Sequence, residues 1–220
     1  MVESHIFVNS RFNSNTYIIS HPGFNDVWIV DPGDTDNIFL WLKKHSKTII
    51  SGVLLTHAHF DHIYGMNDIL NHYPDCPIYV ANTYGVELLH DAKKNGSRYT
   101  EEGPVVVKDR ARIELFKKEM DLWVDTKASI FFTPGHSQDS VCILVDKMFF
   151  TGDTLIKDTR TVTKLKGGSE DKLQESFCLI NTLKGNQIAV FPGHGVFFYL
   201  DEYDLNKSLL KKNLGYGDGA

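Results

Sequence analysis

The 220-residue sequence lacks the long apolar run of a membrane protein, and we expect no secretion leader. No stretch approaches the roughly 18 apolar residues that are needed to span a bilayer. The N-terminal sequence MVESHIFVNS has neither the basic segment nor the apolar segment of a signal peptide. We therefore expect a soluble, cytoplasmic protein that has no membrane partner.

An excess of positive charge is also missing. The formal net charge is -5, whereas general nucleic-acid binding depends on clustered Lys and Arg side chains that contact phosphate groups. The sequence therefore predicts a small-molecule substrate and no nucleic-acid partner. We expect the protein to be a monomer or a homodimer.

Cysteine is scarce, with only Cys76, Cys142 and Cys178 in the chain. Their number is odd and no pair has Cys-X-X-Cys spacing, which argues against a disulfide framework. Cys142 and Cys178 lie in the apolar stretches SVCILV and ESFCLI. We expect both to be buried as small hydrophobic side chains.

The composition that remains is that of a globular protein, with 42% hydrophobic and 23% charged residues. This is enough apolar material to bury a core in one domain, which we place at residues 1–214. Residues 215–220 are expected to form a disordered tail.

Short segments rich in β-branched and aromatic residues alternate with segments of helical periodicity. The expected strands are residues 6–9, 16–20, 27–30, 49–55, 78–80, 105–107, 113–116, 130–132, 141–145, 148–150 and 188–191. The expected helices are residues 35–45, 64–73, 84–94, 169–183 and 201–212. Strands followed by helices thus occur twice. This pattern favours an α/β fold, a four-layered αββα sandwich of two mixed sheets packed face to face with helices outside.

Five of the ten histidines occur in three places, each at the end of an expected strand. The densest place is the sequence THAHFDH, in which His57, His59, Asp61 and His62 fall within six residues. His57 and His59 project to the same side of extended backbone, and the other two follow where the chain turns into a helix. A single catalytic zinc ion takes three protein ligands, so four ligands at this spacing suit two adjacent metal ions better.

Three more candidate ligands follow later strands: His136 in TPGHS, Asp153 in FTGDT and His194 in FPGHG. Taken singly, each is better explained as an ordinary turn residue than as a ligand. The THAHFDH cluster differs, because three histidines and an aspartate buried without a metal ion would carry a steep desolvation cost. Once this cluster is accepted as a metal site, the seven side chains complete two sites.

Five motifs follow one another along the chain: IVDPG at residues 29–33, THAHFDHIYG at 56–65, TPGHS at 133–137, FTGDTL at 150–155 and FPGHG at 191–195. In sequence and order they resemble the motifs of the metallo-β-lactamase superfamily, and most closely those of its glyoxalase II branch. The resemblance covers nearly the whole chain, and five motifs in one order are far more specific than any one alone.

The resemblance implies two ligand groups and a bridging carboxylate: His57, His59 and His136 for one cation, Asp61, His62 and His194 for the other, and Asp153 between them. Asp61 and Asp153 would be the carboxylates of the catalytic centre. Asp31 would brace the ligand loops, because outer partners fix the orientation of metal ligands. We expect two divalent metal ions, zinc first, with iron or manganese as alternatives that such nitrogen-rich sites also accept.

The implied activity is hydrolysis by a metal-activated water, because a pair of cations lowers the pKa of water toward neutrality. A thiolester or related ester suits this chemistry, since a thiolate leaves with little help from an acid. Two alternatives stay open: a mononuclear-iron persulfide dioxygenase of the same fold, and a lactone or phosphodiester hydrolase. Antibiotic hydrolysis is disfavoured, because the secreted zinc β-lactamases that resemble this pattern commonly lack an aspartate at the position of Asp153.

Substrate contacts have one candidate segment, which follows the FTGDTL motif. It carries four cationic side chains that could contact an anionic group of the substrate: Lys157, Arg160, Lys164 and Lys166. That these side chains merely belong to a solvated loop is an equally open interpretation.

Overall fold

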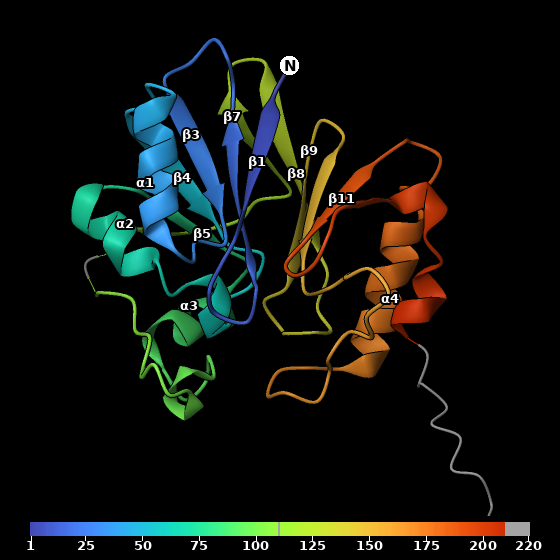
Figure 1. Ribbon diagram of the computed structural model, residues 1–220. Coiled ribbons are helices and arrows are strands. Elements are labelled where there is room, and N and C mark those ends of the chain that lie inside the picture. Colours follow the sequence, from blue (N-terminus) through green and yellow to red (C-terminus); the bar gives the residue numbers. More distant parts are fainter. Residues whose placement is uncertain (110, 210–220) are drawn as a thin grey trace, which may run out of the picture.

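A computed structural model describes residues 1–109 and 111–209, and within them the strands form two mixed sheets of six strands each (Figure 1). The first sheet has the order β1-β2-β3-β4-β5-β6, with β1 (Glu3–Val8), β2 (Asn15–Ser20), β3 (Asp26–Val30), β4 (Ile49–Leu54), β5 (Ile78–Val80) and β6 (Ile113–Leu115). Strands β1, β2 and β3 pair antiparallel, and β3 to β6 pair parallel.

The second sheet has the order β12-β11-β10-β9-β8-β7, with β7 (Glu119–Trp123), β8 (Thr126–Phe132), β9 (Val141–Val145), β10 (Met148–Gly152), β11 (Ala189–Pro192) and β12 (Phe198–Tyr199). Only β10 and β11 pair parallel within it. The carboxyl ends of these two neighbours therefore meet at the same edge of the sheet.

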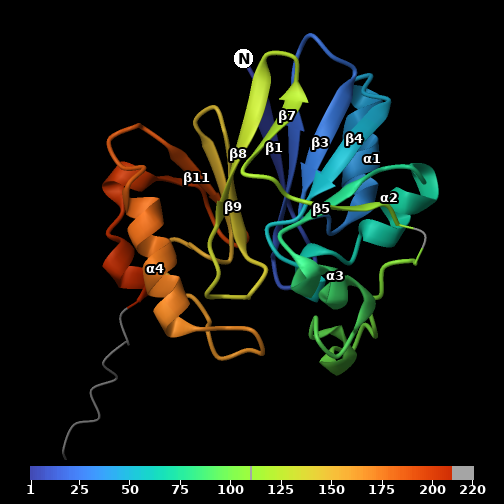
Figure 2. The same ribbon diagram turned by 180° about the vertical axis from the view of Figure 1, so that it is seen from behind.

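The helices lie outside the two sheets, with α1 and α2 on one side and α4 on the other (Figures 1 and 2). They are α1 (Thr35–Lys44), α2 (Met66–His72), α3 (Thr83–His90) and α4 (Glu170–Asn181). The described residues also form the 3-10 turns η1 (Phe60–His62), η2 (Ser97–Tyr99), η3 (Leu200–Glu202) and η4 (Leu205–Ser208). No helix in the described residues is long and apolar enough to cross a membrane.

Three apolar clusters fill the spaces between the four layers. Neighbouring strand residues supply different clusters: Ile29 packs under α1, α2 and α3, whereas Trp28 lies between the sheets. In the same way Phe150 lies between the sheets, whereas Phe149 packs with Phe177 of α4. Successive strand side chains point to opposite faces, so both faces of each sheet are covered. The predicted four-layered αββα fold is confirmed.

Strands β7 and β12 were not predicted, and one predicted strand is not formed. Strand β12 has only two residues, too few to show an alternating pattern. Strand β7 was missed because Glu119 and Asp121 are exposed on it, as its place at the edge of the sheet allows. Residues 105–107 were expected to form a strand but are not paired in a sheet. Their backbone instead bonds to α3 and to Asn95, whose side-chain amide donates to the carbonyl oxygen of Val105 over 2.9 Å.

The expected helix at residues 201–212 is wrong in its described part, which forms the two short turns η3 and η4. The carboxylate of Asp201 accepts hydrogen bonds from the backbone of Gly185 and Gln187, and that of Asp204 accepts from Asn206. The Asp204 side chain caps the start of η4, so a new turn begins there and no single helix runs through residue 204. Residues 210–212 of that helix and the expected tail at 215–220 lie outside the described residues.

The prediction for cysteine burial is confirmed for Cys142 and wrong for Cys178. On α4 the buried residues Leu173, Phe177 and Ile180 recur at helical spacing. Cys178 follows Phe177 directly and therefore points about 100° away around the helix, toward solvent.

The three cysteines should differ sharply in reactivity. Burial raises the pKa of the Cys76 and Cys142 thiols to about 12, so few thiolates form there at pH 8, and only the thiolate reacts. We expect a disulfide reagent to titrate one thiol in the native protein and three in denaturant. Cys178→Ser should remove the native reaction, and rapid labelling of a second thiol in the native variant would contradict the fold.

Candidate metal centre

The seven candidate ligands converge from four strand ends. His57, His59, Asp61 and His62 follow β4 of the first sheet, and three more side chains follow β8, β10 and β11 of the second, namely His136, Asp153 and His194. The glycine before His194 is needed for the close approach, since a Cβ at Gly193 would lie 2.3 Å from the Asp153 Oδ1.

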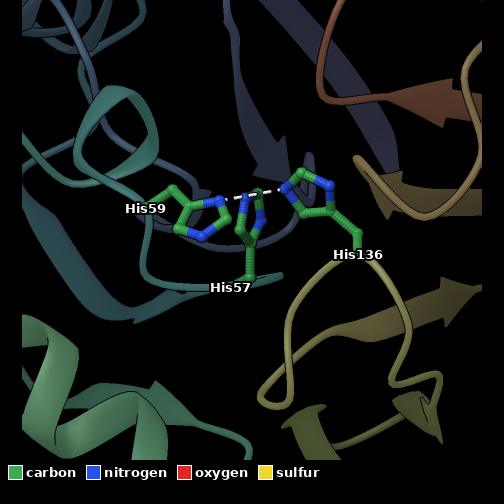
Figure 3. A group of neighbouring side chains, drawn as sticks. All are labelled: His57, His59 and His136. Atoms are coloured by element: carbon green, nitrogen blue, oxygen red, sulfur yellow. Dashed lines mark hydrogen bonds between the residues drawn. The ribbon is translucent and has the colours of Figure 1, made fainter. Parts of the chain in front are cut away.

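The ligand atoms form three groups, each within 4.8 Å: His57 with His59 and His136, His57 with His62 and Asp153, and Asp61 with His62 and His194. His57 belongs to the first two groups and His62 to the last two, so all seven side chains form one continuous cluster. Figure 3 shows the first group, in which His59 Nδ1 and His136 Nε2 face each other over 2.9 Å, with His57 between them.

The carboxylate of Asp153 faces both ends of this cluster. Its Oδ1 lies 3.4 Å from His62 Nε2 and 3.5 Å from His194 Nε2, and its Oδ2 lies 3.7 Å from His136 Nε2. At the far end, the Oδ2 of Asp61 lies 3.2 Å from His194 Nε2. A carboxylate with one oxygen toward each group is suited to serve two neighbouring cations.

Three of the histidines are fixed by a bond from the ring nitrogen that points away from the cluster. His136 Nδ1 donates to the carbonyl oxygen of Val162 over 2.8 Å, and His194 Nδ1 donates to that of Phe12 over 3.0 Å. His62 Nδ1 lies 3.2 Å from Asp31 Oδ2. A carbonyl can only accept, so the bonds to Val162 and Phe12 place a proton on Nδ1 of each ring, and Nε2 is the ring nitrogen that faces the cluster.

Asp31 holds the first sheet to the ligands. Its residue adopts a left-handed conformation with φ 51° at the end of β3. The Oδ1 atom accepts from the Thr56 backbone over 2.8 Å, and the Oδ2 atom accepts from the Thr56 hydroxyl over 2.5 Å as well as facing His62. One buried carboxylate therefore positions both the start of the THAHFDH loop and one of its histidines.

Asp139 plays a comparable part that the sequence analysis missed. It is 1% exposed, and its carboxylate accepts from the Ala58 backbone over 2.9 Å and from the Ser137 hydroxyl over 2.5 Å. The bond ties the loop after β4 to the loop after β8. Its place three residues after His136 is the one sequence signal, and nothing in the residue type tells a turn aspartate from a buried brace.

The electrostatics of the cluster suit a cation. Burial lowers the pKa of His57 well below its usual value and that of His59 to about 4, so both rings stay neutral and keep a lone pair. Burial would raise the pKa of Asp153, but His62, His194 and His136 together hold it well below its usual value. Burial would also lower the pKa of His194, but Asp153 and Asp61 raise it to about 9. The carboxylates of Asp153 and Asp61 therefore favour positive charge at the end of the cluster that holds His194.

The cluster also contains buried polar atoms with nothing to bind. His57 Nε2, His62 Nε2 and Asp153 Oδ1 have no hydrogen-bond partner among the described residues. Leaving such groups unsatisfied costs about 1–3 kcal/mol each or more, and buried polar atoms without partners call for a specific explanation. Metal ligation gives one, because nitrogen and carboxylate donors at these positions match the ligands that divalent transition metals prefer.

The four cationic candidates lie on the segment between β10 and α4, and none of them belongs to a ligand group. Lys157, Lys164 and Lys166 are exposed, and Arg160 pairs with Glu170 at 3.3 Å. Their contact with a substrate stays a prediction.

Comparison with known proteins places these features in a family. The sequence model of the family described as the metallo-beta-lactamase superfamily matches residues 9–194. A hydroxyacylglutathione hydrolase of Marinomonas sp. (strain MWYL1) is 28% identical over 95% of this chain and 74% of its own length. One of Pseudoalteromonas translucida (strain TAC 125) is 26% identical over 68% of this chain. The chain matches only about half of that relative, 49% of its length.

Solved structures agree with the fold. The B3 metallo-beta-lactamase BLEG-1 has a TM-score of 0.80 and 28% identity, covering 90% of this chain and 94% of its own. TTHA1623, crystallised in a di-iron-bound form, has a TM-score of 0.73 and 23% identity, covering 89% of this chain and 94% of its own. The second likeness speaks to the fold alone.

The role of Asp31 can be tested through metal affinity. Asp31→Asn keeps the size of the side chain and tolerates the left-handed backbone, but it removes the negative charge behind His62. We expect a folded variant that binds zinc about 10- to 100-fold more weakly, the usual effect of losing such a partner. Competition with a chelator gives the affinity and circular dichroism checks folding. Asp36→Asn, at an exposed aspartate of α1, should bind zinc like the wild type. Unchanged affinity in the Asp31 variant would contradict this role.

Proposed function

This chain belongs to the metallo-beta-lactamase superfamily, and we propose that it hydrolyses a thiolester or related ester of a small molecule with the help of two divalent cations. One observation carries the proposal: the three ligand groups overlap at His57 and His62, so the chain offers ligands for two adjacent ions instead of one. A mononuclear site needs three or four protein ligands, and the group of Asp61, His62 and His194 would then have no purpose.

The proposed division of ligands follows the geometry. His57, His59 and His136 would hold one cation, Asp61, His62 and His194 the other, and Asp153 would touch both. When bound, the cations would supply a nucleophile from water at neutral pH and polarise the ester carbonyl.

The residues of the chain would supply charge and orientation. Asp61 and Asp153 would offset part of the positive charge of the cations. The neutral rings of His57 and His59 would bind without adding charge. The carbonyl oxygens of Phe12 and Val162 would keep the rings of His194 and His136 from turning. Rigid ligands of this kind would hold the charges of the site in fixed positions, and such preorganisation contributes to rate enhancement.

A thiolester is preferred among substrates for two reasons. The two relatives described above are named hydroxyacylglutathione hydrolases. A thiolate also leaves without a strong proton donor, because a free thiol has a pKa of about 8.5. A β-lactam is kept as a second candidate because BLEG-1 is called a B3 metallo-beta-lactamase, although the aspartate at position 153 disfavours it. Lactone and phosphodiester hydrolysis remain alternatives, and the substrate panel described below tests them.

Zinc is the proposed metal, and iron or manganese are the alternatives. Iron is included because TTHA1623 was crystallised in a di-iron-bound form. The persulfide dioxygenase alternative differs from the proposal in metal count and in chemistry. It predicts one iron ion per chain and consumption of oxygen, whereas the proposal predicts two ions and none. The cytoplasmic location and the state of association stay predictions.

The proposal is tested by Asp153→Ala. We expect the variant to lose at least one of two bound metal ions and to lose hydrolysis, because Asp153 faces both ligand groups. Elemental analysis of purified protein gives the metal content, and a panel of thiolesters, lactones, a phosphodiester and a cephalosporin gives the activity.

Asp75→Ala, at an exposed aspartate, is the matched control and should keep both properties. Two ions and full turnover in the Asp153 variant would exclude the proposed role. Turnover of the cephalosporin alone would favour the second candidate, and one iron with oxygen consumption would favour the dioxygenase.

A further inference from the structure

Two residues that orient ligand histidines also carry exposed apolar side chains. Phe12, whose carbonyl oxygen holds His194, is 63% exposed, and Val162, whose carbonyl oxygen holds His136, is 52% exposed. A carbonyl and a side chain on one residue lie only a few bonds apart, so each apolar group begins within a few bonds of the oxygen atom that holds a ligand ring. Exposed apolar side chains beside a buried polar site are typical of a ligand-binding surface.

The position of Phe12 is strongly constrained. Phe12 and Asn13 have φ values of 54° and 51°, a region that a bulky residue such as phenylalanine rarely adopts. The backbone of Ser14 donates to the carbonyl oxygen of Arg11, and its hydroxyl donates to that of Asp61 over 2.7 Å. The ring of Phe12 meets that of Phe60 edge to face, with centroids 5.3 Å apart. Phe60 lies between the ligands His59 and Asp61 in sequence. We call the paired rings of Phe12 and Phe60 the first wall and the side chain of Val162 the second.

Val162 stands on an equally well anchored segment. The Thr161 hydroxyl just before it donates to the carbonyl oxygen of Thr154 over 2.9 Å, one residue after the ligand Asp153. Farther along, the hydroxyl of Tyr84 on α3 donates to the carbonyl oxygen of Lys166 over 3.1 Å. The segment therefore runs from the second sheet to a helix beside the first, and it places Val162 next to His136.

Two of the cationic groups close to Phe12 and Val162 in sequence are already engaged, whereas Lys164 is exposed. The guanidinium group of Arg11 lies over the ring of Tyr64, 4.5 Å from its centroid. That of Arg160 pairs with Glu170. What Phe12 and Val162 themselves offer a substrate is apolar contact.

We propose that Phe12 and Val162 select substrates whose acyl group is an apolar chain. The inference rests on the proposed ester hydrolysis and names its substrate class: the reacting carbonyl lies at the ligand cluster, and the chain extends over one of the two walls. Each methylene group removed from water in this way strengthens binding by up to about fourfold.

Binding of products tests the walls without turnover. Straight-chain carboxylates from acetate to octanoate are titrated into the zinc-loaded protein by calorimetry. We expect affinity to rise about two- to threefold per methylene, less than for full burial, because the walls are partly open. Phe12→Ala and Val162→Ala keep the carbonyl groups that hold the histidines. They should therefore keep their zinc content, while at least one should lower octanoate affinity roughly tenfold.

The matched controls are Leu40→Ala, which is 64% exposed on α1, and Val124→Ala, which is 95% exposed beyond β7. Both should bind the whole series like the wild type. An affinity that does not depend on chain length, or a dependence that survives in both wall variants, would overturn the inference.

Kinetics separate this inference from the proposed function. Acetyl, butanoyl and octanoyl esters of one common thiol should show kcat/KM rising with chain length, and the affected wall variant should lose most on the octanoyl ester, mainly through KM. If thiolesters turn over without chain-length preference, the proposed selection by the walls is wrong and the proposed hydrolase function is kept. If no ester turns over while carboxylate binding depends on chain length and on the walls, the proposed hydrolase function is wrong and the apolar binding surface is kept.

Discussion

The carboxylate of Asp31 is the interaction on which the rest of the candidate metal centre depends. It lies at the end of β3, accepts two hydrogen bonds from Thr56 at the end of β4, and faces the ring of His62. The backbone carbonyl oxygen of Asp31 accepts from the Thr16 hydroxyl of β2 over 2.7 Å. Three neighbouring strands of the first sheet are thus fixed to one residue. The orientation of the THAHFDH loop follows from the sheet and not from the loop alone.

The second sheet is bonded to the first through residues of β2. The backbone of Asn15 donates to the carbonyl oxygen of Gly193 over 2.7 Å, and the hydroxyl of Tyr17 donates to that of Pro192 over 2.6 Å. Both bonds end on the turn that carries His194. Asp139 makes the reciprocal link, since it follows β8 and binds the backbone of Ala58. The spacing of the seven ligands is therefore set by how the two sheets pack, with bonds crossing in both directions.

Much of this arrangement could be predicted because it depends on residue types at short spacing. The THAHFDH cluster can be recognised from adjacent letters, and His136, Asp153 and His194 each follow an apolar strand and a glycine. The helical limits of α4 were close to those expected, because Ser169 caps the helix by accepting from Lys172. Sequence patterns of this kind report local chemistry, and here the local chemistry agrees with the fold.

The features that escaped prediction depend on contacts distant in sequence. The bonds to His136 and His194 come from backbone carbonyl groups of Val162 and Phe12, and every residue has such a group. Asp139 looks like any turn aspartate until its partner at Ala58 is known. Cys178 appears apolar in the linear sequence, and only the rotation of the helix turns it outward.

The buried ring nitrogens and the carboxylate oxygen without partners have a consequence for the life of the protein in a cell. A cation bound only to the folded chain would stabilise it by about 4 kcal/mol when the free ion exceeds its dissociation constant a thousandfold. A difference of that size changes how often a protein opens and is degraded by proteases. Because both sheets contribute ligands, such an ion would link the first sheet to the second. The steady-state amount of the protein would then follow the nutritional supply of its metal.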